Sequence, residues 1–142
     1  MGKWMFYRTS MTPVAPVAGD VRERHLCSLI EKGQDMIAVL DPKGVILYQS
    51  PSAKRTLGYS PEDLTGKRAA DLAHPDDRLR VIDAIASSMA APEGAIRVEY
   101  RVRTREGSWR DVESILTNAM NDPAVAGILV NSRDVTERKR AP

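Results

Sequence analysis

Apolar and charged residues alternate strictly over residues 96 to 103. The apolar positions are Ile96, Val98, Tyr100 and Val102, and the charged positions between them are Arg97, Glu99, Arg101 and Arg103. Successive side chains of a strand point to opposite faces, so this pattern predicts a strand with one buried and one solvated face. Two further strand-like runs follow turn-forming residues, from about Trp109 to Asn118 and from about Val125 to Arg133.

An earlier pair of apolar runs predicts a hairpin. Residues 36–40 and 45–49 flank the tetrapeptide Asp41-Pro42-Lys43-Gly44. Proline presets the backbone angle that a type I turn needs, and glycine permits the turn to leave again, so the two runs are predicted to pair in an antiparallel sense.

The middle of the chain shows helical patterns. Ser60-Pro61 followed by Glu62 and Asp63 is typical of a helix start, with a cap, a first-turn proline and first-turn acids. His74-Pro75-Asp76-Asp77 repeats this arrangement before a longer helix that ends at Pro92 and Gly94. The apolar stripe of that helix is predicted at Leu79, Ile82, Ile85, Ala86 and Met89.

Near the N-terminus, the pattern predicts an amphipathic helix over residues 21 to 32, with Asp20 as its cap and Gly33 as its stop. We therefore divide the chain into a linker or appended remnant (1–19), this helix (20–33), one globular domain (34–134) and the start of a C-terminal helix (135–142). The fold class is α+β, a five-stranded antiparallel sheet with helices on one face.

Composition narrows the function. The 142 residues carry a net charge of +2 and one cysteine, Cys27. So small a charge provides no strong field for nucleic acid or an anionic membrane, and a single cysteine excludes an intramolecular disulfide framework. No apolar run approaches the roughly 20 residues of a membrane-spanning helix. We predict a cytoplasmic domain without nucleic-acid or membrane contact.

Residues 25 to 139 resemble the PAS family in its form with a C-terminal PAC segment. No stretch is decisive by itself, but six occur in the family's order and spacing. They are residues 35–41 (DMIAVLD), 44–52 (GVILYQSPS), 57–66 (LGYSPEDLTG), 74–77 (HPDD), 100–109 (YRVRTREGSW) and 133–139 (RDVTERK).

The resemblance implies a signal-input and dimerisation module of a larger signalling protein, and we predict a sensor histidine kinase. It also implies a cavity between sheet and helices, where a small molecule could bind. The alternative is a constitutive interaction module whose core is too full for any ligand. Cavity candidates are Val39, Leu57, Met89, Tyr100, Leu129, Asn118 and Asn131; the two asparagines are also explained as turn-proximal or solvent-facing residues.

No bound cofactor is expected from the sequence. Light-reactive, flavin-binding PAS relatives place a cysteine on a short central helix, whereas Cys27 lies upstream, so flavin is disfavoured. Haem-binding relatives use a histidine in the longest helix, but His74 precedes that helix and His25 precedes the domain, so haem is disfavoured as well. No metal-ligand cluster or nucleophile with a matching base is evident, so we expect no enzymatic activity.

The exit end carries the family's output motif. Asp134 stands where a helix cap is expected, with Thr136 and Glu137 in the first turn. In the family this junction connects the sheet to a helix that leads into the effector. Because the chain stops at Pro142, the sequence is interpreted as an input domain whose C-terminal effector lies outside it.

The helix at 21–32 is predicted to form part of a homodimer interface. Val21, Leu26, Leu29 and Ile30 form its apolar stripe, and so short a helix must bury that stripe to be stable, against a second copy or, alternatively, against its own sheet. A chain beginning at Lys32 should therefore dissociate into monomers at concentrations where the full chain is dimeric. Analytical ultracentrifugation of both chains checks this, and equal dimerisation would place the interface elsewhere.

Overall fold

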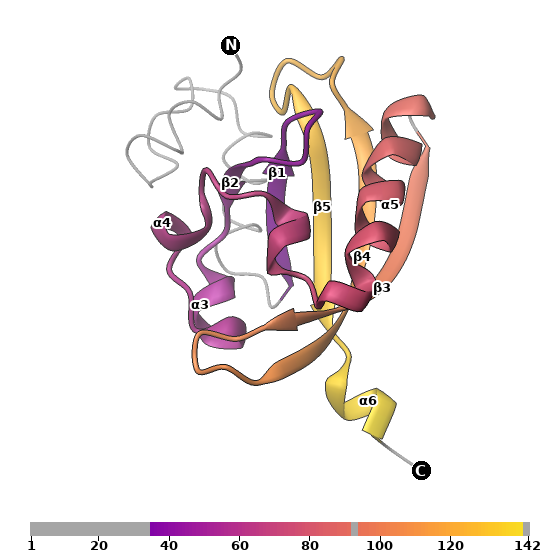
Figure 1. Cartoon of the computed structure of the whole chain (residues 1–142). Coiled ribbons are helices and arrows are strands. Elements are labelled where there is room, and N and C mark those ends of the chain that lie inside the picture. The colour runs from indigo at the N-terminus through magenta and orange to yellow at the C-terminus, as the bar shows by residue number, and fades with distance from the viewer. Residues whose placement is uncertain (1–34, 92–93, 141–142) are drawn as a thin grey trace.

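Five strands form one antiparallel sheet in the computed structural model, which describes residues 35–91 and 94–140 (Figure 1). This confirms the predicted five-stranded antiparallel sheet, and its strand order is β2-β1-β5-β4-β3. The strands are β1 (Met36–Leu40), β2 (Ile46–Gln49), β3 (Ala95–Arg103), β4 (Trp109–Ala119) and β5 (Gly127–Asp134). The predicted helix at 20–33, with its proposed dimer residues Val21, Leu26, Leu29 and Ile30, lies outside the described residues, as does the segment 1–19.

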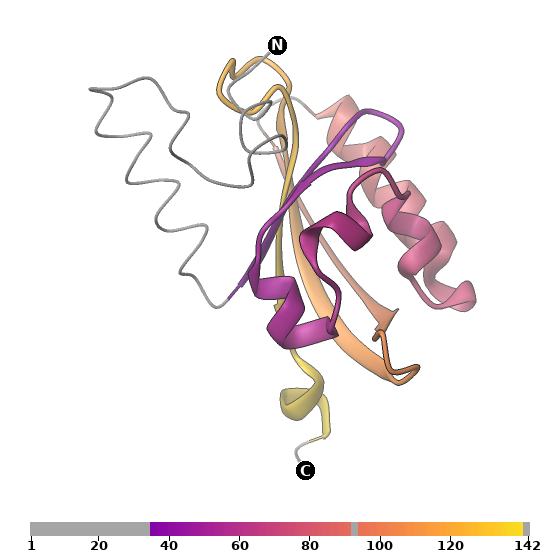
Figure 2. The same ribbon diagram turned by 90° about the vertical axis from the view of Figure 1, so that its left-hand side faces the viewer.

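Short helices and one longer helix cover a single face of this sheet (Figures 1 and 2). The helices are α3 (Ser52–Leu57), α4 (Pro61–Leu64), the 3-10 turns η1 (Ala69–Leu72) and η2 (Pro75–Asp77), and α5 (Arg78–Ala90). The final helix, α6 (Thr136–Arg140), extends beyond the end of the sheet. The main core fills the space between the sheet and the helices, and a smaller apolar cluster around Val39 and Tyr48 lies on the opposite face.

The β1–β2 hairpin has the predicted turn. The Asp41 carboxylate accepts hydrogen bonds from the backbone of Lys43 (2.8 Å) and Val45 (2.9 Å), and Gly44 has a φ of +85°. Such a φ strains any residue with a Cβ, which explains the glycine. The turn is therefore encoded locally, by its own four residues.

The free edge of β3 is covered by backbone and side-chain groups of the helical layer. The His74 N–H donates to the Arg101 carbonyl (2.8 Å), and the Tyr59 hydroxyl donates to the Arg103 carbonyl (3.0 Å). The Arg105 N–H, just beyond the strand, donates to the Leu57 carbonyl (2.9 Å). An exposed edge of unpaired groups would invite pairing with another chain, and these bonds satisfy the C-terminal end of the edge.

The buried face of α5 differs from the predicted stripe. Val81, Ala84, Ile85 and Ser88 face the sheet, whereas Leu79 and Ile82 are 74% and 48% exposed and Ala86 is exposed. Of the predicted positions, Ile85 is buried and Met89 is partly buried. The predicted stripe is thus rotated away from the actual one.

Asp77 explains this rotation. Its buried carboxylate accepts hydrogen bonds from the Arg101 backbone N–H (2.8 Å) and from the Arg101 guanidinium (3.0 Å to each oxygen). Residue 77 is thereby held against the edge of β3, and the helical period then brings positions 81, 84, 85 and 88 to the same face. The hydrogen bonds from Arg101 lower the pKa of Asp77 to about 2, against the opposing effect of burial.

Asp77→Asn should destabilise the domain by about 2 kcal/mol at neutral pH, since a depressed carboxyl pKa is a stabilisation of the folded state. The folded-state pKa lies below the ordinary value of 3.8, so this stabilisation is present above about pH 4 and is lost as the pH falls towards about 2. Urea denaturation across that range measures both effects. Asp76→Asn, the same change at an exposed neighbour, is the control; equal losses in the two variants would contradict the assignment.

Candidate functional site

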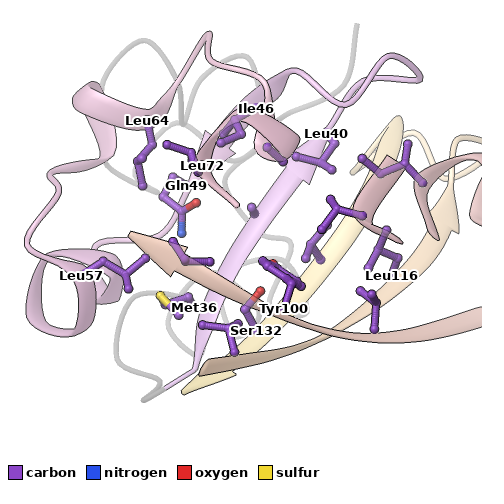
Figure 3. Close-up of a pocket in the computed structure, with 18 residues that line it drawn as sticks. Met36, Leu40, Ile46, Gln49, Leu57, Leu64, Leu72, Tyr100, Leu116 and Ser132 are labelled. Atoms are coloured by element: carbon purple, nitrogen blue, oxygen red, sulfur yellow. The ribbon is translucent and has the colours of Figure 1, made fainter. Parts of the chain in front are cut away.

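A cavity of about 70 Å³ lies between the sheet and the helices (Figure 3). Its wall is almost entirely aliphatic, and every strand contributes to it together with α3, α4, η1 and α5. The lining residues are Met36, Ala38, Leu40, Ile46, Gln49, Leu57, Leu64, Ala69, Leu72, Val81, Ile85, Val98, Tyr100, Val102, Val112, Leu116, Val130 and Ser132.

The polar side chains of the wall are Gln49, Tyr100 and Ser132. Figure 3 shows Tyr100 near Ser132, and Gln49 nearer to Leu64 and Leu72. The Tyr100 hydroxyl is 2.7 Å from Ser114 Oγ, which is 2.7 Å from Ser132 Oγ, so one hydrogen-bonded row crosses β3, β4 and β5. Burial raises the pKa of Tyr100, and the bonds to the two serines oppose that rise only in part. The phenol is therefore neutral at physiological pH and can act as donor or acceptor.

Of the predicted cavity residues, Leu57 and Tyr100 lie in this wall. Val39 and Leu129 do not, and their assignment is corrected. They are paired neighbours on β1 and β5, but both belong to the cluster on the opposite face of the sheet. Asn131 is two positions along β5 from Leu129 and is exposed. The two strands were predicted, but their apolar runs do not indicate which face each residue occupies.

Met89 and Asn118 are also corrected, for another reason. Met89 is near the C-terminal end of α5, and Asn118, on β4, lies beside it. Neither residue lines the cavity. The Asn118 amide donates to the carbonyls of Ser88 (3.2 Å) and Met89 (3.4 Å), and its oxygen accepts from the Met120 N–H (3.0 Å). Asn118 thus ties the end of α5 to β4, satisfying carbonyls that the helix leaves free.

Two residues of the polar wall escaped the sequence analysis. Gln49 closes an apolar run at the end of β2, and Ser132 interrupts the apolar run of β5. Polar residues in otherwise apolar strands were the available clue, but it pointed equally to Asn131. Only the direction of each side chain separates the cavity residues from the exposed ones.

The junction between β5 and α6 has the predicted cap. The Asp134 carboxylate accepts a hydrogen bond from the Thr136 N–H (2.8 Å) and another from Arg110 Nε (2.8 Å). Burial raises the pKa of Asp134, and the bonds from Arg110 and Thr136 outweigh it, so the pKa lies below its usual value. The buried Thr136 hydroxyl in turn accepts from the Asp111 N–H (2.8 Å), which ties the first turn of α6 to β4. Glu137 is exposed, with an oxygen 4.0 Å from the Arg110 guanidinium.

A larger polar groove of about 700 Å³ lies beside this junction. It runs between α3, the β3–β4 loop and the start of α6, and Arg110, Asp134 and Glu137 line it. Met36, Leu57 and Ser132 line both the groove and the cavity. These three side chains therefore lie between the cavity and the groove beside the β5–α6 junction.

Of the side chains that could suggest catalysis, His74 caps a helical turn and Asp77 forms an ion pair. His74 Nδ1 accepts a hydrogen bond from the Asp76 N–H (3.1 Å), and Asp77 is held by Arg101. The part of the chain that the structure describes contains no cluster of three or more metal-ligating side chains. Within the same residues, no helix combines the length and the apolar character needed to cross a lipid bilayer.

Residues 46–126, more than half of the chain, match the family model of the PAS fold. This chain belongs to the PAS family. Its fold is also that of a solved PAS domain from Colwellia psychrerythraea, with a TM-score of 0.70 at 23% identity over 81% of this chain and 98% of the other.

Curated relatives of this PAS domain are signalling proteins. The blue light receptor lreA of Aspergillus flavus is 35% identical over 92 residues, which are 58% of this chain and 10% of that protein. The sensor histidine kinase TmoS of Ectopseudomonas mendocina is 25% identical over 138 residues, 95% of this chain and 14% of that protein. Across the first relatives that it matches, the chain spans 7 to 16% of their length. It is thus similar to one domain of each.

The prediction that disfavoured flavin is wrong in the light of these relatives. It rested on the position of one cysteine, yet the PAS domain is similar to a protein named as a blue light receptor. In the present structure the cavity has a volume of about 70 Å³. A flavin ring would fit only with α3 to α5 farther from the sheet, and flavin is accordingly an outcome of the test below.

Asp134→Ala should cost about 0.5 to 2 kcal/mol, because α6 loses its cap. Asp134→Asn is the matched variant, since asparagine still caps but no longer pairs with Arg110 as a charge. If the cap dominates, urea denaturation will show a clearly smaller loss for asparagine than for alanine. Equal losses would assign the effect to the ion pair, and no loss in either would remove the junction role.

Proposed function

We propose that this PAS domain is the non-catalytic signal-input module of a larger sensor protein, and that it binds a small neutral molecule in its central cavity. The observation that carries the proposal is the shared wall: Met36, Leu57 and Ser132 separate the cavity from the groove that contains the output junction. A molecule that enlarges the cavity would press on the residues that also face Asp134.

The lining defines the chemical class of the ligand. All of the lining residues are uncharged, and a buried unpaired charge would be costly. Three polar side chains in an aliphatic wall favour an apolar molecule with one or two hydrogen-bonding groups. The volume suits a few non-hydrogen atoms, and a larger ligand requires α3 to α5 to move outward.

Transmission to the exit helix follows from chain continuity. Ser132 lines the cavity and stands two positions before Asp134 on the same strand. The hydrogen-bonded row from Tyr100 through Ser114 to Ser132 links this point to β3 and β4. A ligand that forms a hydrogen bond with Tyr100 or Ser132 would compete with the hydrogen bonds of that row. The change would occur close to the end of β5, where α6 begins.

For the larger protein we propose a cytoplasmic sensor histidine kinase region that works as a homodimer. The alignment to a sensor histidine kinase over nearly the whole chain supports this proposal. Assignment of His74, Asp76 and Asp77 to caps and ion pairs supports the absence of catalysis in the domain.

Light reception is a second candidate function. It is favoured by the similarity to the blue light receptor lreA. In that case the purified domain should be coloured and should absorb blue light, whereas a small neutral ligand leaves it colourless. An interaction module without any ligand is the third outcome, and it would show neither colour nor an added mass.

Ala38→Leu tests the cavity directly. Ala38 is buried in the wall, so leucine there should fill the small volume and abolish ligand binding. Native mass spectrometry of the purified full chain should show an added mass in the wild type that is lost in this variant. Ala86→Leu makes the same change at an exposed position of α5 and should keep the added mass.

Circular dichroism of both variants confirms that they are folded before they are compared. An added mass that persists in Ala38→Leu would place the ligand outside the cavity. A wild-type protein with no added mass, no visible absorbance and no thermal shift with small neutral alcohols would favour the interaction module instead.

A further inference from the structure

We propose that Glu99 and Glu113, on the outer face of the sheet, set the direction of the exit helix by binding its two basic residues, Arg138 and Lys139. The proposal concerns how the direction of α6 is controlled. It rests on the proposed function only in taking a ligand in the cavity as the stimulus. The two glutamates are called the acid pair below.

The β3–β4 register places the acid pair directly opposite one another. Both side chains point away from the cavity, because their neighbours Val98, Tyr100 and Val112 face it. Two carboxylates facing each other across an antiparallel pair repel and destabilise the sheet unless cations lie between them. The acid pair therefore needs positive partners.

Arg97 supplies the first of these partners from within the sheet. Its Nε donates to Glu113 at 2.8 Å, and its terminal nitrogen contacts both Glu113 and Glu99. The hydrogen bond from Arg97 lowers the pKa of Glu113, burial opposes it, and the charges of Arg97 and Arg138 lower it further. Glu113 is thus held ionised at neutral pH.

The remaining partners come from α6. Lys139 Nζ lies 3.3 Å from Glu99, and the Arg138 guanidinium lies 3.6 Å from Glu113 and 4.0 Å from Glu99. The first turn of α6 is fixed separately, by Asp134 and by the bond between Thr136 and Asp111. One attachment point locates a helix, but a second point is needed to set its angle. The acid pair is that second point.

The strength of this attachment suits a switch. Arg138 and Lys139 are 56% and 46% exposed, and ion pairs of such exposure are weak and screened by salt. The acid pair also alternates with the cavity wall, since Glu99 adjoins Tyr100 and Glu113 adjoins Ser114, which share a hydrogen bond. A shift of these two strands towards or away from a ligand would move the acid pair and release or tighten α6.

The orientation of α6 can be measured in the full chain without any ligand. Spin labels on Asn121→Cys and Arg140→Cys, in a Cys27→Ser background, report the distance from the β4–β5 loop to the tip of α6, which lie at opposite ends of the sheet (Figure 1). Pulsed electron spin resonance should give one narrow distance distribution. Glu99→Gln with Glu113→Gln should broaden and shift it, as should about 1 M salt, where the screening length falls to about 3 Å.

Matched variants separate charge from packing. Glu62→Gln with Glu106→Gln removes the same two charges at exposed positions elsewhere and should leave the distribution narrow. Arg138→Lys with Lys139→Arg keeps both charges and should also leave it narrow, whereas Arg138→Gln with Lys139→Gln should reproduce the broadening. A distribution that stays narrow in the acid-pair variant, or that broadens equally in the Glu62 and Glu106 control, would overturn the proposal.

The outcome is independent of the proposed function. If no molecule binds the cavity, the proposed function fails while the ligand-free distance measurement still decides the role of the acid pair. If a ligand binds but α6 keeps its direction in every variant, the acid pair has no role and the sensory proposal stands.

Discussion

The pairing of Asp77 with Arg101 is the interaction on which the helical layer depends. It places a buried carboxylate at the start of α5 against the edge strand of the sheet, where it accepts hydrogen bonds from both the backbone and the guanidinium of Arg101. This contact determines which face of α5 is turned inward. Val81 and Ile85 then form part of the roof of the cavity. Without the contact, the more apolar face of the helix, with Leu79 and Ile82, would compete for burial.

Alternation along β3 and β4 places neighbouring residues on opposite faces of the sheet. Tyr100 and Ser114 belong to the hydrogen-bonded row at the cavity, while Glu99 and Glu113 hold cations on the other side. Neighbouring residues of a strand move together because the backbone between them is stiff. A local change at the cavity is therefore felt on the outer face of the sheet without a separate relay of side chains.

The energies involved are small at each step. The cavity holds only a few atoms, so a ligand of that size can contribute little binding free energy, and it shifts a conformational equilibrium by no more than its preference for one state. A C-terminal helix held by one cap, the hydrogen bond between Thr136 and Asp111 and exposed ion pairs matches that scale. A helix buried deeply in the core could not be moved by so small a ligand.

Local sequence determined the elements of this protein, and tertiary contacts decided how the elements face one another. The turn at Asp41 to Gly44, the cap at His74, the alternation in β3 and the cap at Asp134 could all be predicted, because each depends on residues a few positions apart.

The cavity could be predicted only in part. Leu57 and Tyr100 lie in its wall, but Val39, Leu129 and Asn131 face the other way, since a period of two is equally satisfied by either face. Asn118 bonds to α5 and the acid pair contacts α6, and these partners lie far away in the chain. Which face is buried and which distant charges meet depends on register and helix rotation, and those are set only when the whole sheet and its helices pack together.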